Sequence, residues 1–213
     1  MILQWHGHAC FKASGSQIDA SVVIDPFDAS IGLKLPRLSA DVVLVTSSDS
    51  AHGNWQAVKG AATAPFVIEY PGEYEVRGVF ATAVAAIKKN GKDKTLLLSL
   101  GLDDVVIGHL GTIDRQLTES ELDALGRIDI LLLPVGGDAM LNASLAVEVL
   151  KEIEPRVVIP MQYKIPGAKI EAAPVDQFLK EYGIKDAERL DKIKLLKRDL
   201  PAEETRVIVL NQS

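Results

Sequence analysis

The sequence predicts an α/β protein of 213 residues in which β-sheets are covered by helices. Apolar residues make up 47% of the chain but aromatic residues only 5%, so the core must be built from Val, Ile, Leu and Ala, as in buried sheets. Short apolar runs broken by turns fill the first half, and helical and extended patterns alternate in the second. With a mean hydropathy of +0.15, these features exclude a disordered chain and predict one domain over residues 1–213.

Charge and cysteine content exclude several classes of protein. The chain has 23 Lys+Arg against 29 Asp+Glu, a formal net charge of −6, which excludes a simple electrostatic nucleic-acid binder. Cys10 is the only cysteine, so there is no internal disulfide or thiolate zinc cluster, and we expect a buried thiol. No apolar stretch approaches the roughly 20 residues that span a bilayer, and no signal-peptide pattern is visible. We therefore expect a cytoplasmic protein without a membrane partner.

The first half is expected to form hairpins of short strands. Val42–Val45 is a continuous apolar run, typical of a strand buried on both faces, and it leads into the polar loop 46–54. Loops at the ends of buried strands are where α/β proteins place their chemistry. A turn is expected at Lys89–Lys92. The predicted strands are Ile2–Trp5, Cys10–Ala13, Ile18–Ile24, Val42–Val45, Glu73–Lys88, Lys94–Leu100 and Val105–Leu110.

The second half is expected to alternate helices and strands. Thr118 and Glu121 have the spacing of a capping box, which predicts a helix from there to about Leu125. Asn142 is a candidate N-cap for a helix that Pro155 ends. A third helix is predicted from Pro174 through Tyr182, and strands are predicted over Ile128–Leu133, Val157–Ile159, Ile193–Lys197 and Thr205–Leu210.

Seven short motifs occur in a fixed order over most of the chain. They are Gly7–Phe11, Ile24–Phe27, Asp41–Thr46 with the loop to His52, Pro71–Val76, His109–Gly111, Asp129 with Leu131–Gly137, and Ile159–Tyr163. In this order they resemble the metallo-β-lactamase superfamily, in the branch similar to L-ascorbate-6-phosphate lactonases and related predicted zinc-dependent hydrolases. The resemblance implies a four-layer αβ/βα sandwich with a dinuclear metal site at the ends of its sheets.

The same resemblance implies seven metal-ligand positions. A loop patterned H-x-H-x-D-H, a later His-Leu-Gly-Asp and a Pro-Met-His-Tyr motif supply the ligands in the family. In this chain the corresponding residues are Ser47, Asp49, Ala51, His52, His109, Thr112 and Gln162. Only His52 and His109 match the family pattern.

The histidine content argues independently against a dinuclear site. Such a site needs about five imidazoles and two carboxylates, because each zinc ion collects three or four ligands. The chain contains four histidines, and His6 and His8 are placed on the first strand, outside the ligand positions. Ala51 and Thr112, at the two carboxylate positions, are neutral, which avoids clustered like charges in a site without metal. We therefore expect no resident metal cofactor.

Asp49 is the exception, because an acid replaces an imidazole there. It could pair with a protonated His52 or His109, or serve as a residual oxygen ligand. If a cation binds, the expected ion is zinc or manganese, held by Asp49, His52 and His109.

Other candidates carry two interpretations each. The resemblance implies that Asp25 orients a ligand or a loop from the second shell, a position also expected for His8; alternatively, Asp25 is a turn residue before Pro26. His8 and Cys10, two residues apart, could form a nucleophile and base, but a lone cysteine is usually a small core residue. The carboxylates of 69–75 are expected on a surface turn and Gly136–Gly137 in a tight turn.

Three functions remain open. The preferred one is a metallo-β-lactamase-fold protein that has lost its dinuclear site and binds a small molecule or a protein. The second is a metal-dependent hydrolase of a lactone or phosphoester with a reduced mononuclear site. The third is a structural subunit of a homo-oligomer or hetero-oligomer.

Overall fold

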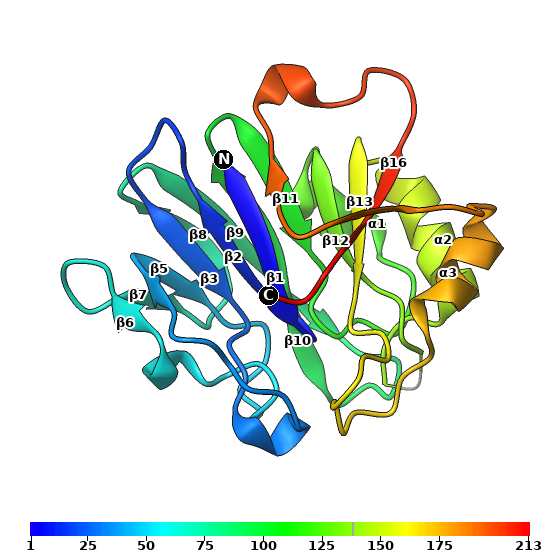
Figure 1. The fold of residues 1–213 in the computed structure, drawn as a ribbon, viewed down its shortest axis with the longest axis horizontal. Helices are drawn as coiled ribbons and strands as arrows, with labels where there is room; N and C mark the ends of the chain where they lie inside the picture. Colours follow the sequence, from blue (N-terminus) through cyan, green and yellow to red (C-terminus); the bar gives the residue numbers. More distant parts are fainter. Residues whose placement is uncertain (138) are drawn as a thin grey trace.

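Two β-sheets form the framework of the computed structural model, which describes residues 1–137 and 139–213 (Figure 1). The six-stranded sheet has the order β15-β1-β2-β3-β5-β7. Its strands are β1 (Ile2–Gly7), β2 (Cys10–Ser14), β3 (Ser21–Ile24), β5 (Val42–Leu44), β7 (Phe66–Ile68) and β15 (Ile193–Lys194). A separate pair joins β4 (Ser39–Ala40) to β6 (Lys59–Gly60).

The eight-stranded sheet has the order β14-β16-β13-β12-β11-β10-β9-β8. Within it β11, β12, β13 and β16 run parallel, whereas β8 to β11 are antiparallel neighbours. Its strands are β8 (Gly72–Val76), β9 (Val79–Ile87), β10 (Lys94–Leu102), β11 (Val105–His109), β12 (Ile130–Pro134), β13 (Val157–Met161), β14 (Glu188–Leu190) and β16 (Arg206–Leu210). The loops after β5, β11 and β13 carry the candidate site.

Three α-helices are found in the described residues: α1 (Glu119–Leu125), α2 (Ala143–Ile153) and α3 (Val175–Tyr182). They lie on the side of the eight-stranded sheet (Figure 1). The predicted starts are confirmed: Thr118 and Glu121 form the capping box of α1, and the Asn142 side chain accepts the Leu145 N–H at the start of α2. The connections between β3 and β6 contain the 3-10 turns η1 (Ala29–Ile31) and η2 (Trp55–Ala57) in place of α-helices. The predicted mixed fold class is confirmed.

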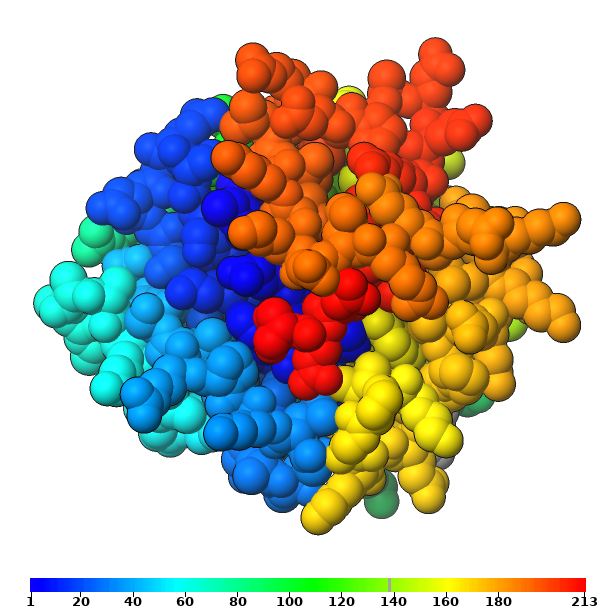
Figure 2. All heavy atoms as spheres, in the orientation of Figure 1, coloured from blue at the N-terminus to red at the C-terminus, as the bar shows by residue number. Residues whose placement is uncertain are grey.

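The core joins apolar residues of both sheets and of the helices. Its largest fully buried side chains include Trp5, Phe11, Phe27 and Phe178, and the Cys10 thiol is buried as predicted. In Figure 2 the C-terminal residues lie over the N-terminal strands, where the Ser213 N–H donates to the Trp5 carbonyl at 3.0 Å. Within the described residues, no helix has the length and apolar character needed to cross a membrane.

Three sequence predictions are corrected. Glu73–Lys88 is a hairpin rather than one strand, because Arg77 and Gly78 both adopt positive φ and form the tight turn between β8 and β9. Strand β3 begins at Ser21 rather than Ile18, because the Gln17 and Ile18 N–H groups donate to Asp103 instead of a neighbouring strand. His8 lies in the turn between β1 and β2, not on the strand.

Candidate functional site

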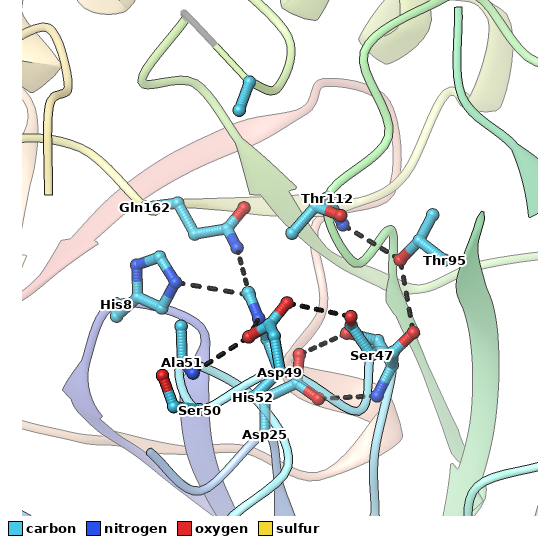
Figure 3. A network of polar contacts seen from close by, with 12 residues as sticks. His8, Asp25, Ser47, Asp49, Ser50, Ala51, His52, Thr95, Thr112 and Gln162 are labelled. Carbon is cyan, nitrogen blue, oxygen red and sulfur yellow. Dashed lines mark hydrogen bonds and ion pairs between the residues drawn. The ribbon is translucent and has the colours of Figure 1, made fainter. Parts of the chain in front are cut away.

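Loops from both sheets bring most of the predicted positions together (Figure 3). The loop after β5 supplies Ser47, Asp49, Ala51 and His52, and the loops after β11 and β13 supply Thr112 and Gln162. The β1–β2 turn adds His8 from the opposite side. Among the predicted positions, His109 lies apart from this group, because its ring nitrogens contact backbone groups instead.

Asp49 organises the loop after β5. Its Oδ1 lies 2.7 Å from His52 Nδ1 and also accepts the Ala51 N–H at 2.8 Å, while Oδ2 accepts the Ser47 hydroxyl at 2.8 Å. Of the two partners expected for Asp49, the structure selects His52. Because Nδ1 of His52 faces a carboxylate, its Nε2 points inward.

His52 Nε2 meets two further polar groups in the interior. His8 Nε2 lies 3.2 Å from it, and the Gln162 amide nitrogen lies 3.0 Å from it. All three side chains are buried, and the Gln162 amide oxygen has no hydrogen-bond partner among the residues that the structure describes. His8 was predicted on a strand, so this contact was not expected. Gly7, which precedes His8 and favours a turn, was the signal available.

Asp25 binds the first residue of the same loop, Thr46. Its carboxylate accepts the Thr46 N–H at 2.7 Å and the Thr46 hydroxyl at 2.6 Å, and Oδ2 lies 3.7 Å from His109 Nε2. The side chain is fully buried. The carboxylate of Asp25 thus holds the start of the loop after β5 in place.

His109 is bound by backbone groups through both ring nitrogens. Nε2 lies 3.1 Å from the Ala9 carbonyl, which can only accept, and Nδ1 accepts the Gly111 N–H at 3.1 Å. These two contacts fix the neutral tautomer with the proton on Nε2. His109 therefore links the end of β11 to the β1–β2 turn.

The histidines differ in their affinity for protons. Burial lowers the pKa of His8 to about 3, with the charge of His52 acting in the same direction. Burial also opposes protonation of His52, but the hydrogen bond to Asp49 and the charges of Asp25 and Asp49 outweigh it and raise the pKa of His52. Burial lowers the pKa of His109. The site thus favours protonation at His52 over protonation at His8 or His109.

The carboxylates near His52 differ as well. Burial raises the pKa of Asp25, although the nearby histidines and the hydrogen bonds from Thr46 act against it. For Asp49, partial burial acts upward, but the hydrogen bond to His52 prevails and holds the pKa well below its usual range. The positive charge of Lys88 acts on His52 in the opposite direction and lowers its pKa. The Lys88 ammonium donates to the Ala139 carbonyl at 2.5 Å.

The structure does not support a nucleophilic role for Cys10. The thiol is fully buried, and burial together with the charge of Asp25 raises its pKa well above the usual value. His8 is directed toward His52 instead. The carboxylates of 69–75 are exposed, as expected, but Glu73 and Glu75 lie on the edge strand β8 rather than in a turn.

A pocket of about 430 Å³ lies beside the loop after β5. Its walls include Thr46, Ser47, Glu69, Tyr70, Lys94 and Thr95. Thr95 connects it to the site, because its hydroxyl donates to the Thr46 carbonyl at 3.4 Å and accepts the Thr112 N–H at 3.1 Å. The pocket and the histidine cluster therefore share one loop.

Comparison with known proteins agrees with the fold and the motif order. Residues 2–162 match the family described as the beta-lactamase superfamily domain. The chain belongs to the metallo-β-lactamase superfamily. Among solved superfamily members, a Thermotoga maritima protein described as a candidate zinc-dependent hydrolase is 32% identical with a TM-score of 0.81, over 98% of this chain and 97% of that one.

Curated superfamily relatives carry names of the same kind. A UPF0173 metal-dependent hydrolase of Thermoplasma acidophilum is 29% identical over 188 residues, covering 75% of this chain and 81% of that protein. One from Methanocaldococcus jannaschii is 26% identical over 209 residues, covering 84% and 91%. A metallo hydrolase from Ignicoccus hospitalis, 18% identical with a TM-score of 0.63 over 85% of this chain and 89% of its own, shares the fold.

Proposed function

We propose that this chain is a metallo-β-lactamase-fold protein that does not assemble a two-metal centre and that acts by binding a small polar ligand. The observation that carries the proposal is the hydrogen bonding of His109. Both of its ring nitrogens are bound by the backbone, so neither has a lone pair directed at a metal. The two carboxylate positions, Ala51 and Thr112, supply no ligand oxygen.

The remaining polar groups also support a site without two metal ions. Asp49 already receives three hydrogen-bond donors from its own loop and His52. Across the described part of the chain, no group of three or more His, Cys, Asp or Glu side chains is arranged to hold a metal. The donor set thus does not fit the dinuclear centre that the family implies.

The pocket beside Ser47 is the place proposed for the ligand. It is large enough for a small molecule, and its walls combine an amine, a carboxylate and hydroxyl groups from Lys94, Glu69 and Thr95. These groups suit a polar ligand that carries both donors and acceptors. Ser47 lines the pocket and donates its hydroxyl to Asp49, so a ligand bound in the pocket would act on Asp49 through Ser47.

A second candidate is a mononuclear hydrolase of a lactone or phosphoester that uses zinc or manganese. The names of the relatives favour it, and so does the Asp49–His52 pair, since a carboxylate behind a histidine is the usual support of a metal ligand. In such an enzyme the cation would supply an activated hydroxide.

The test compares the natural chain with a variant in which the family ligands are rebuilt. The variant carries Ser47→His, Asp49→His, Ala51→Asp, Thr112→Asp and Gln162→His. Zinc titration by calorimetry should never reach two equivalents for the natural chain and should reach two for the variant, if circular dichroism shows that both are folded. Two equivalents bound by the natural chain, or zinc-dependent hydrolysis of a phosphodiester or lactone by it, would overturn the proposal.

A further inference from the structure

The pocket beside the loop after β5 lies between the two sheets. The segments that follow β5 and β7 form one wall, and because these strands are parallel neighbours, both segments leave the sheet at the same edge. Residues of β9 and β10 form the other wall. The Leu96 N–H of β10 donates to the Thr46 carbonyl at 2.9 Å, and both residues are buried. Backbone contacts between the walls therefore hold the pocket in shape.

Two opposite charges line this pocket, one on each wall. Glu69 directly follows β7, and Lys94 is the first residue of β10. Both residues are exposed. The ion pairs found in the described part of the chain involve neither of them. A carboxylate and an ammonium group are thus available to a ligand in the same pocket.

The neutral polar groups of the pocket are less available. Thr46, Ser47 and Thr95 donate their hydroxyl protons to other groups of the protein. A hydroxyl group has one proton to donate, so these three can accept from a ligand but do not donate to it. Polar recognition therefore depends mainly on the charges of Glu69 and Lys94.

Apolar groups make up much of the remaining wall. Val45 and Leu96 are buried beneath the pocket surface, and Ala85, the cross-strand neighbour of Leu96, is exposed. Tyr70 is 68% exposed, although its carbonyl accepts the Tyr74 hydroxyl at 3.0 Å and so has a fixed place. An exposed aromatic ring beside a pocket offers a large contact area to an apolar group. The pocket therefore suits a ligand with an apolar body.

We propose that the pocket binds a small zwitterion, an α-amino acid or a dipeptide with apolar side chains. Its ammonium group lies against Glu69, its carboxylate against Lys94 and its side chain against Tyr70. A ligand with one charge leaves either Glu69 or Lys94 without a partner. The volume of about 430 Å³ is within the range of about 300–1,000 Å³ that is typical of small-molecule sites. This inference rests on the proposed function and names the class of ligand.

The test compares zwitterions with their singly charged forms, with binding to the full-length chain followed by NMR at millimolar ligand. The probes are L-leucine and leucyl-leucine, each also as the N-acetyl form, which keeps only the carboxylate, and as the C-terminal amide, which keeps only the ammonium group. The zwitterion should bind about two- to fivefold more tightly than either blocked form, the effect of one exposed ion pair. The N–H signals of Ser47 and Thr95 should shift, because both residues line the pocket.

Two variants assign each charge of the ligand to its partner. Glu69→Gln should bind the zwitterion and its N-acetyl form equally but still discriminate against the amide. Lys94→Met should show the reverse. Glu73→Gln and Lys92→Met are the matched controls, because both residues are exposed and lie outside the pocket, and these variants should discriminate as the natural chain does. All four substitutions replace exposed residues, and circular dichroism establishes that each variant is folded.

The tighter binder of L-leucine and leucyl-leucine shows which separation of the two charges fits, and either result supports the inference. Failure of both zwitterions to bind, or equal affinity for a zwitterion and its blocked forms, would overturn the inference while leaving the proposed function intact. Unchanged discrimination in Glu69→Gln and Lys94→Met would also overturn it. Two equivalents of zinc bound by the natural chain would instead contradict the proposed function.

Discussion

Asp49 Oδ1 and His52 Nδ1 lie 2.7 Å apart, and this contact dominates the electrostatics of the loop after β5. In the metal-free protein, with chelator present, we expect His52 to titrate above the usual value of about 6.5, because Asp49 and Asp25 outweigh the effect of burial. Asp49→Asn should lower the pKa of His52. Histidine ring signals in an NMR pH titration measure both.

The internal reference for that titration is His6, whose contact with Ser213 lies away from the loop. Its pKa should be the same in the natural chain and in Asp49→Asn. An unchanged His52 in the variant would show that the carboxylate does not act on this ring.

His109→Leu tests the structural role assigned to His109. The substitution leaves the Ala9 carbonyl and the Gly111 N–H without their partner in the buried interior. We expect a loss of about 2–4 kcal/mol in the free energy of unfolding, because each unpaired buried polar group costs about 1–3 kcal/mol. Urea denaturation measures the loss. A free energy of unfolding equal to that of the natural chain would contradict the structural role of His109.

Glu121 links helix α1 to the segment before it. Its carboxylate accepts two hydrogen bonds from Arg115 and the Thr118 N–H. The Arg115 hydrogen bonds lower the pKa of Glu121 from 4.5, so its stabilisation is complete above the unfolded pKa and is lost as pH falls through the lower folded pKa. Glu121→Gln should cost about 1–2 kcal/mol at neutral pH.

Denaturation of the natural chain and Glu121→Gln, each at neutral and acidic pH, checks this dependence. The difference between the two proteins should shrink in acid. A difference that is constant with pH would mean that the charge of Glu121 does not contribute.

Asp103 replaces strand pairing for the segment before β3. Its carboxylate accepts the Ser16, Gln17 and Ile18 N–H groups and lies 2.9 Å from the Met1 ammonium. Asp103→Asn removes the charge and one acceptor, so we expect a lower melting temperature and a loss of about 2–4 kcal/mol. Calorimetry measures it, with Asp104→Asn as the neighbouring control on the exposed side of the turn. Equal melting temperatures for the two variants would contradict this role.

Local signals predicted most of the secondary structure. The capping box at Thr118 and the N-cap at Asn142 succeeded because both depend on groups within one turn of the chain. The Glu73–Lys88 hairpin was missed because Arg77 occupies a left-handed position that usually holds Asn, Asp or Gly. The start of β3 was missed because Asp103, distant in sequence, competes for its N–H groups.

The candidate site could be predicted only in part, because some of its contacts join residues that are distant in sequence. Motif order placed Asp49, His52 and Gln162 in one group, and the structure brings them together. Gly7 could have indicated a turn at His8. No pattern in the sequence, however, indicates that this turn directs His8 into that group or that His109 is bound by backbone atoms on both sides. These facts depend on how two sheets meet, and neither residue's local context contains that information.

The β1–β2 turn is bound to the eight-stranded sheet by the Gln162 N–H on the His8 carbonyl and by His109 Nε2 on the Ala9 carbonyl. These contacts cross between the sheets, so the turn cannot open while the sheets stay packed. The backbone N–H of Gln162 should therefore exchange its hydrogen with solvent as slowly as the N–H groups of the central strands do, at the rate of global unfolding. An ion or ligand then reaches the histidine cluster through movement of the loop that carries Asp49, so one segment of the chain controls its uptake.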